Sequence, residues 1–379
     1  MSNLYRRLIR PAAFALDAET AHEIGIESLR LGLGSEFAQR IAAKRFGCDA
    51  FPKIERFGLT FANPLGMAAG FDKNGIVVNQ LAALGFGFVE VGTVTLNPQK
   101  GNEKPRLFRL TEDKALINRL GFNNDGAVTI SERLKRLQRR CIVGINIGRN
   151  KDVPNEEAVE NYLGAFDLIR DVADYIAVNI SSPNTPNLRD LQRGENLEEL
   201  LGALIDRNRV LSTGSGRPES TAKPSEGGTK NAKPLLVKIA PDLSATDIEE
   251  IADTCLRLGV SGIIATNTTV SRRGLRSREI DAIGAGGLSG GPLLERSNEV
   301  IRSIYRHSNG QLPIVGVGGI FTPEDAFEKI AAGACLVQAY TGFIYKGPSF
   351  ARGINSGLLK ILNERGFESV DAAVGCHAR

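Results

Sequence analysis

The stretch YIAVNISSPNTPNLRDLQRGENLEELLGALIDRNR, residues 175–209, contains the structural unit on which the fold assignment depends. Residues 175–180 are mostly apolar, as in a buried strand, and the chain then changes abruptly to Ser, Asn and Pro. Residues 195–209 have the apolar spacing of an amphipathic helix. One strand, one polar loop and one helix therefore follow one another here.

The same unit recurs along the chain from about residue 60 onward. The expected strands are residues 65–70, 88–93, 142–147, 175–180, 235–240, 262–266, 313–317 and 334–339. The expected helices are residues 74–84, 125–139, 156–172, 195–209, 246–258, 293–306, 323–332 and 350–364. Because strands and helices alternate and no GxGxxG follows the first strand, this pattern predicts an α/β fold, a closed parallel (β/α)8 TIM barrel, rather than a doubly wound sheet.

The composition excludes several classes of protein. With 379 residues, 42% of them hydrophobic and 24% charged, the chain is long enough for a large globular core. A net charge of +4 without a basic run weighs against nucleic-acid binding. The five cysteines are scattered, which predicts a reduced compartment and no metal site. No apolar run is long enough to span a membrane.

Residues 212–233, STGSGRPESTAKPSEGGTKNAK, interrupt the repeat. They contain no aromatic residue and no aliphatic residue larger than Ala, so they cannot bury enough surface to become ordered. The segment lies between a helix and the next strand, which places it on the N-terminal face of a barrel, away from the catalytic face. We expect a flexible polar insertion that leaves activity intact.

Residues 1–45 form an N-terminal helical extension before a catalytic barrel of residues 46–379. In residues 20–33 the charged side chains occupy one narrow side of the expected helix, and apolar side chains cover most of the remainder. Leu8 and Ile9 with Arg6, Arg7 and Arg10 beside them would suit a helix lying at a membrane surface. The alternative is a helix that plugs the barrel bottom or packs on its side.

Polar residues gather where the expected strands end, and in a (β/α)8 enzyme the working residues lie there. Six asparagines share this location: Asn118, Asn123, Asn146, Asn179, Asn184 and Asn267. Since each amide offers two donors and an acceptor, they favour a ligand rich in carbonyl and N–H groups. GVGG after the seventh strand, YTG after the eighth and GGLSGG at 286–291 favour a phosphate bound by backbone N–H groups.

Lys238 lies inside the fifth expected strand, where an ammonium is costly unless it is paired or has a function. It could be a Schiff-base nucleophile, as in barrel aldolases, or could stabilise negative charge on a cofactor. A buried ion pair is the structural alternative. It is weakened because the neighbouring strand ends carry Asn, Thr and Ser, with little acid beyond Glu90.

Ten motifs in order resemble the class 2 dihydroorotate dehydrogenases, the flavin enzymes of pyrimidine synthesis. They are AAGFDKNG, VEVGTVTLNPQKGNEKPRLFRL, INRLGFNNDG, GINIGRNK, VNISSPNTPNLRDLQ, VKIAPDL, ATNTT, GGLSG, GVGGI and LVQAYTGFIYKGP. The resemblance runs from about residue 3 to residue 365 and includes the extension. It implies FMN-dependent oxidation of (S)-dihydroorotate to orotate, with ubiquinone or menaquinone as the electron acceptor.

The resemblance also implies roles for individual residues. FMN would be held by Ala69, Gly70, Thr93, Asn146, Asn179, Lys238, Thr266, Gly290, Gly319, Tyr340 and Thr341. Dihydroorotate would be held by Lys73, Asn118, Arg119, Leu120, Gly121, Phe122, Asn179, Asn184, Asn267 and Thr268. The catalytic base would be Ser182, the second serine of the fourth loop.

The N-terminal extension favours class 2 over class 1, whose members use Cys as the base; none of the five cysteines falls in the corresponding loop. In class 2 the extension lies on a membrane and opens a tunnel for quinone, near which His22 and Arg109 fall, with Tyr340 between tunnel and cofactor. We therefore expect a peripheral protein on the cytoplasmic face of the bacterial inner membrane. The alternatives are another FMN barrel dehydrogenase using fumarate or NAD, or more distantly an aldolase using Lys238.

Overall fold

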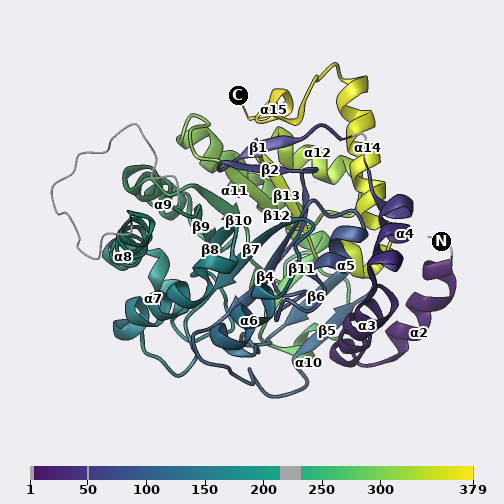
Figure 1. Cartoon of the computed structure of the whole chain (residues 1–379), viewed down its shortest axis with the longest axis horizontal. Coiled ribbons are helices and arrows are strands. Elements are labelled where there is room, and N and C mark those ends of the chain that lie inside the picture. The colour runs from purple at the N-terminus through teal and green to yellow at the C-terminus, as the bar shows by residue number, and fades with distance from the viewer. Residues whose placement is uncertain (1–3, 49–50, 214–231, 379) are drawn as a thin grey trace.

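Eight parallel strands form a closed barrel in the computed structural model, which describes residues 4–48, 51–213 and 232–378 (Figure 1). Around the barrel they are β3 (Leu65–Met67), β4 (Phe88–Val94), β7 (Ile142–Ile147), β8 (Tyr175–Asn179), β9 (Leu235–Ile239), β10 (Gly262–Ala265), β12 (Ile314–Val317) and β13 (Leu336–Ala339). Pairing of β13 with β3 closes the ring. The predicted (β/α)8 barrel and all eight of its strands are confirmed.

A helix follows each barrel strand. The eight helices are α5 (Val78–Ala83), α6 (Gly126–Lys135), α7 (Ala158–Ile169), α8 (Gly194–Thr213), α9 (Ala245–Leu258), α11 (Leu294–His307), α12 (Pro323–Ala331) and α14 (Phe350–Glu364). Ser244 and Asp247 form a capping box at the start of α9. The first predicted helix began too early, because the Asp72 carboxylate accepts the N–H groups of Ile76 and Val77 and holds a turn before α5.

Small residues in the strands make room for aromatic side chains inside the barrel. A Cβ on Gly144 would lie 2.0 Å from the ring of Tyr175, and one on Gly66 would lie 2.3 Å from the ring of Phe88. The two rings are completely or almost completely buried and contact each other edge to face. The Tyr175 ring therefore fills the barrel interior beside β7, which brings its hydroxyl to the buried polar cluster described below.

A second sheet was missed in the sequence. It has three antiparallel strands in the order β11-β6-β5, with bounds β5 (Leu107–Leu110), β6 (Ala115–Asn118) and β11 (Gly287–Gly290). Its strands belong to the loops that follow β4 and β10, so they lie at the C-terminal end of the barrel. Also unpredicted are β1 (Ile54–Arg56), β2 (Leu59–Phe61), α10 (Ile280–Ile283), α13 (Thr341–Lys346) and α15 (Val370–Ala373).

The N-terminal extension is helical, as predicted. A π-helical turn η1 (Tyr5–Ile9) leads into α2 (Arg10–Ala15), α3 (Ala18–Gly32) and α4 (Glu36–Phe46), the purple elements at one side of Figure 1. Helix α3 packs against β5 and α4 against α5, so the extension lies beside the barrel near its catalytic end and does not plug the bottom. None of the described helices is both long and apolar enough to cross a membrane.

The predicted insertion begins later than expected, because α8 continues to Thr213. Residues 214–231 of the insertion lie outside the described residues. At its far end the backbone N–H of Lys233 donates to Asn208 Oδ1 (3.0 Å), and Asn208 Nδ2 donates to the carbonyl oxygen of Lys233 (2.7 Å). These two hydrogen bonds join the chain just before β9 to the last turns of α8.

Candidate active site

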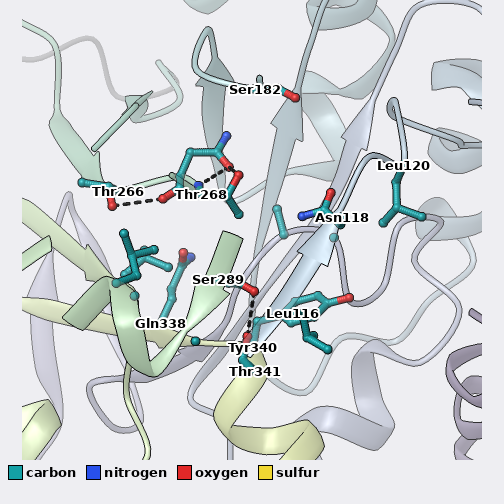
Figure 2. A pocket seen from close by; sticks show the side chains of 18 of the residues that line it. Leu116, Asn118, Leu120, Ser182, Thr266, Thr268, Ser289, Gln338, Tyr340 and Thr341 are labelled. Carbon is teal, nitrogen blue, oxygen red and sulfur yellow. Dashed lines mark hydrogen bonds between the residues drawn. The ribbon is translucent and has the colours of Figure 1, made fainter. Parts of the chain in front are cut away.

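A pocket opens at the C-terminal ends of the barrel strands, beneath the β5-β6-β11 sheet (Figure 2). Predicted residues that line it are Ala69, Gly70, Lys73, Thr93, Asn118, Leu120, Gly121, Phe122, Asn179, Ser182, Asn184, Lys238, Thr266, Asn267, Thr268, Gly290, Gly319, Tyr340 and Thr341. Four predicted residues, Asn146, Arg119, His22 and Arg109, are not among its lining. The structure thus brings nearly all the predicted residues to one cavity.

A completely buried carboxylate, that of Glu90 on β4, lies beneath the pocket at the centre of the barrel. Its Oε1 accepts from Asn146 Nδ2 (2.9 Å) and Lys238 Nζ (3.2 Å). Its Oε2 accepts from Gln338 Nε2 (2.7 Å) and from the Tyr175 hydroxyl (3.1 Å). Four strands, β7, β8, β9 and β13, therefore each supply a donor to the carboxylate on β4, so both oxygens of this buried group are hydrogen-bonded.

Lys238 forms an ion pair with Glu90, the structural alternative that the residues at the neighbouring strand ends had weighed against. The lysine reaches across the barrel from β9 to β4, a partnership that no local sequence pattern reveals. Lys238 still lines the pocket, so the pair holds a positive charge at the pocket floor. A lysine engaged with a carboxylate is a poor Schiff-base nucleophile, because the paired ammonium is not the free amine that attacks a carbonyl.

Amide side chains form a hydrogen-bonded network around Asn179, at the end of β8. Asn179 Nδ2 donates to Thr93 Oγ1 (2.9 Å) and to Asn146 Oδ1 (3.0 Å). Asn179 Oδ1 accepts from Asn267 Nδ2 (3.2 Å) and from the Ser181 hydroxyl (3.1 Å). Asn146 therefore acts from behind the pocket by fixing its neighbours, and the network presents the remaining polar atoms in set orientations.

Ser182 lies on the loop after β8 and is almost fully buried (5% exposed). Its Oγ accepts the backbone N–H of Asn184 (3.2 Å), and its hydroxyl has no acceptor among the described residues. Asn184 Nδ2 in turn donates to Asn118 Oδ1 on β6 (3.1 Å). Figure 2 shows Ser182, Asn118 and Leu120 around the same side of the pocket. A polar ligand there would meet a dry hydroxyl and two oriented amides.

Two buried acceptors on the pocket lining lack a hydrogen-bond partner among the described residues. They are Oε1 of Gln338 on β13 and Oδ1 of Asn123 in the loop after β6. Leaving such atoms unsatisfied costs about 1–3 kcal/mol each, so a native site with two of them favours a ligand that carries N–H donors.

Glycines line the end of the pocket that is formed by β11 and by the residues after β12 and β13. A Cβ on Gly290 (φ +103°) would lie 2.3 Å from the carbonyl oxygen of Lys114, and one on Gly319 (φ +77°) would lie 2.5 Å from Leu294 Cβ. Thr341, the first residue of α13, has its hydroxyl 2.9 Å from that of Ser289. The first amides of a helix have no intrahelical partner, so α13 adds N–H groups to this glycine cradle.

His22 and Lys73 lie at the side where α3 meets the pocket. Burial lowers the pKa of Lys73 to about 8; nearby Glu19 opposes this shift and Arg106 adds to it. Burial, with the charge of Lys73, lowers the pKa of His22 to about 3, so this imidazole is neutral at pH 7. The His22 ring is 5.2 Å from that of Phe71, which is 5.8 Å from that of Tyr340 on the pocket wall.

Arg119 and Arg109 use their side chains for structure. Arg119 Nη1 donates to the carbonyl oxygen of Ile283 (2.6 Å), and its guanidinium lies over the ring of Phe108. Arg109 Nη1 donates to the carbonyl oxygen of Ala13 (3.0 Å) and so binds the end of α2. The Arg119 side chain is thus engaged outside the pocket, and Arg109 holds the extension against β5.

Several lining residues were not predicted. Besides Asn123, whose amide was noted but given no role, they include Leu107, Leu116, Ser289, Leu293, Phe321 and Gln338. Gln338 had a readable signal, since it is a polar residue inside an apolar strand run, like Lys238. Leu107, Leu116 and Ser289 belong to the sheet that the sequence did not reveal; the glycine motif at 286–291 includes Ser289 but gave no role to its side chain.

Comparison with known proteins agrees with this geometry. The family model described as dihydroorotate dehydrogenase matches residues 53–362. A dihydroorotate dehydrogenase (quinone) of Roseiflexus sp. is 46% identical over 99% of both chains, and one of Christiangramia forsetii is 48% identical over 94% of this chain and 99% of its own. The crystal structure of DHODH from Eimeria tenella in complex with ferulenol is 39% identical, with a TM-score of 0.78 over 92% of this chain and 95% of that one.

Proposed function

The chain belongs to the dihydroorotate dehydrogenase family, and from this premise we propose that it oxidises (S)-dihydroorotate to orotate, with FMN as prosthetic group and ubiquinone or menaquinone as electron acceptor. It is an oxidoreductase of the quinone-dependent type, since the relatives that match it over nearly their whole length carry that name. The reaction would serve de novo pyrimidine (UMP) synthesis. The observation that carries the proposal is the amide-ringed, glycine-lined pocket in a chain of this family.

FMN fits the donor and acceptor set of the pocket. The unpartnered Oε1 of Gln338 would accept an N–H of the flavin's pyrimidine ring, and the ammonium of Lys238 would place positive charge beside the cofactor. The glycine cradle at Gly290 and Gly319, with the amides at the start of α13, suits a phosphate. Bound FMN would supply the hydride acceptor for C6 of dihydroorotate and the route of electrons to quinone.

Ser182 is the proposed base: its oxygen would take the proton from C5 of the substrate as its own hydroxyl proton passes to an acceptor in the loop. The N–H of Asn184 on Ser182 Oγ would stabilise negative charge on that oxygen, and burial keeps water from competing for the proton. Thr185, three residues further on, has a buried hydroxyl without a partner among the described residues and could relay the proton onward. Lys73 and the asparagine amides would stabilise negative charge on the pyrimidine carbonyl.

The N-terminal helices are the proposed route for quinone and the proposed contact with a membrane. Apolar side chains on them that are at least half exposed are Leu4, Leu8, Ile9, Ile24, Leu31, Phe37 and Ile41. Arg6 and Arg10 lie close enough to Lys346 to lower its pKa, after burial, so cations gather beside this apolar surface. These features support peripheral attachment to anionic lipid, for which we propose the cytoplasmic face of the bacterial inner membrane.

One spectroscopic experiment tests the proposed reaction. The purified protein should be yellow, bleach when dihydroorotate is added without oxygen, and regain colour on addition of a quinone. Recovery with fumarate or NAD⁺ but not with quinone would favour another FMN barrel dehydrogenase. A colourless protein that borohydride traps covalently on a carbonyl substrate would favour the aldolase reading of Lys238 and overturn the proposal.

A further inference from the structure

A second buried lysine, Lys329 on α12, lies outside the pocket and has no role in the proposed reaction. It is fully buried, and its Nζ donates to Ser297 Oγ (2.8 Å) and Asn298 Oδ1 (2.9 Å), both on α11. None of the ion pairs among the described residues includes this Nζ; Asp325 is the one carboxylate whose charge acts on it, without a direct contact. Its partners are therefore neutral, whereas Lys238 at the barrel centre is paired with Glu90.

Lys329 lies directly behind the loop that follows β12. A Cβ on Gly316 would be 3.0 Å from Lys329 Cδ, so the lysine stem packs under the end of this strand. The Ser297 hydroxyl that accepts from Lys329 donates to the carbonyl oxygen of Val317 (2.6 Å). Val317 and the two residues after it, Gly318 and Gly319, line the pocket. Two hydrogen bonds thus connect the ammonium to the backbone of the glycine loop.

The charge balance at this end of the pocket is incomplete. Among the described lining residues the only cations are Lys73, which lies near Glu19, and Lys238, which is paired with Glu90. A phosphate in the glycine cradle would carry negative charge into a site with no side-chain cation of its own. A buried ammonium that is not paired with a carboxylate is also costly, because its positive charge has no negative partner. Each charge would compensate the other, because interactions are weakly screened in the protein interior.

We propose that Lys329 is a positioning residue for the phosphate of FMN. It fixes the loop at Val317–Gly319 through Ser297 and supplies, from behind that loop, the positive charge that the phosphate lacks within the pocket. The inference depends on the proposal that FMN is the cofactor. Burial lowers the pKa of Lys329 to about 7, with the charge of Asp325 opposing the shift, and a phosphate bound nearby would raise this pKa again.

Flavin binding tests the inference, because riboflavin carries the same ring system as FMN without the phosphate. Full-length protein freed of flavin would be titrated with each, following quenching of flavin fluorescence. We expect Lys329→Met to raise the Kd for FMN by about tenfold to a hundredfold and to leave the Kd for riboflavin within about twofold. Lys360→Met, an exposed lysine on α14, is the matched control and should change neither value.

The outcomes separate the two proposals. If Lys329→Met weakens the binding of FMN and of riboflavin equally, the role of the lysine is merely structural. If it leaves FMN binding unchanged, the lysine has no role in binding. Either result overturns the inference and leaves the cofactor assignment standing. A wild-type protein that binds neither flavin overturns the cofactor assignment instead.

Should Lys329→Met fail to fold, Ser297→Ala supplies the second variant. It keeps the ammonium and removes the hydroxyl between Lys329 and Val317. We expect FMN binding to weaken by about threefold to tenfold, with riboflavin binding unchanged, because the two hydrogen bonds that link Lys329 to the loop backbone are lost while the ammonium remains. Equal loss of both flavins in this variant would count against the inference.

Discussion

Ser182 is the single side chain whose removal should affect the chemistry most. Ser182→Ala takes away the proposed proton acceptor but leaves the two amides proposed to hold the substrate, Asn118 and Asn184. In anaerobic stopped flow we expect the rate of flavin bleaching by dihydroorotate to fall about 10²- to 10⁴-fold, while orotate still binds.

Ser131 offers the matched control for this substitution. It is a buried serine on α6 whose hydroxyl has no hydrogen-bond partner among the described residues, and it does not line the pocket. In the Ser131→Ala variant dihydroorotate should bleach the flavin at the wild-type rate. If the flavin of Ser182→Ala is also bleached at that rate, the base is another group.

Lys73 gives the site a predicted pH dependence. Its pKa of about 8 means that the ammonium is present below that pH and lost above it. Glu19, Glu23, Asp72 and Arg106 are the charged groups that act on it. The nearby His22 is neutral at pH 7. Because the proposed substrate and product are anions, the Kd of orotate should be flat below pH 8 and rise above it by up to about tenfold per pH unit.

The measurement is a fluorescence or absorbance titration of the oxidised protein with orotate between pH 6 and pH 10. Lys73→Met should bind orotate more weakly and with no inflection near pH 8. An inflection that survives in this variant would assign the pH dependence to a different group.

The N-terminal extension is the element whose role the barrel does not explain. Deleting residues 1–40 would be an ambiguous test, because Glu19 on α3 forms a buried ion pair with Arg106. Arg106 Nη2 donates to Glu19 Oε1 (2.7 Å) and Nε contacts both carboxylate oxygens. Without α3 an unpaired buried charge would remain, at a cost of about 3–5 kcal/mol, and folding itself would suffer.

Substitutions on the exposed surface of these helices avoid that difficulty. Leu31 and Phe37 are 68% and 74% exposed. We expect the double variant Leu31→Glu and Phe37→Glu to reduce co-sedimentation with anionic phospholipid vesicles and turnover with vesicle-embedded quinone. Each substitution removes an exposed apolar side chain and adds a negative charge. Reduction of a soluble dye with dihydroorotate should be unchanged.

Val128→Glu on α6 is the control for this experiment, since Val128 is an exposed apolar residue (54%) far along the chain from the extension. It should leave vesicle binding unaltered. Equal losses of dye reduction and quinone turnover in the double variant would instead favour a purely structural role for the extension.

The elements that the sequence predicted poorly are short and non-local. Strands β5, β6 and β11 have four residues each, and β11 pairs with β6 from more than 160 residues away, as in the pairing of Leu288 with Ile117. Barrel strands β10, β12 and β13 are equally short, but each of them belongs to a strand-loop-helix unit that repeats along the chain, whereas β5, β6 and β11 lie inside loops and have no such repeat. The β5-β6-β11 sheet over the pocket was therefore not predicted, although the family resemblance did name two of its pocket-lining residues, Asn118 and Gly290.

At the scale of the whole molecule, the barrel was predictable because its signal repeats. Each strand is a buried run that ends in polar or glycine residues, and eight such runs with intervening helices leave few alternative folds. The polar and glycine residues at the expected strand ends also predicted where most of the pocket lies. The pairing of side chains inside the barrel could not be predicted in this way. Lys238 and Glu90 are 148 positions apart, and only the closed ring brings them together.

The position of Glu90 has a consequence for how the chain folds. Its carboxylate is on the second barrel strand, and two of its four donors, Lys238 and Gln338, arrive from the fifth and the eighth. A half-barrel that formed on its own would hold a buried anion without these donors, which is unfavourable. Partial barrels should therefore be unstable intermediates, so that the strands on either side of the ring become ordered together and unfolding is cooperative.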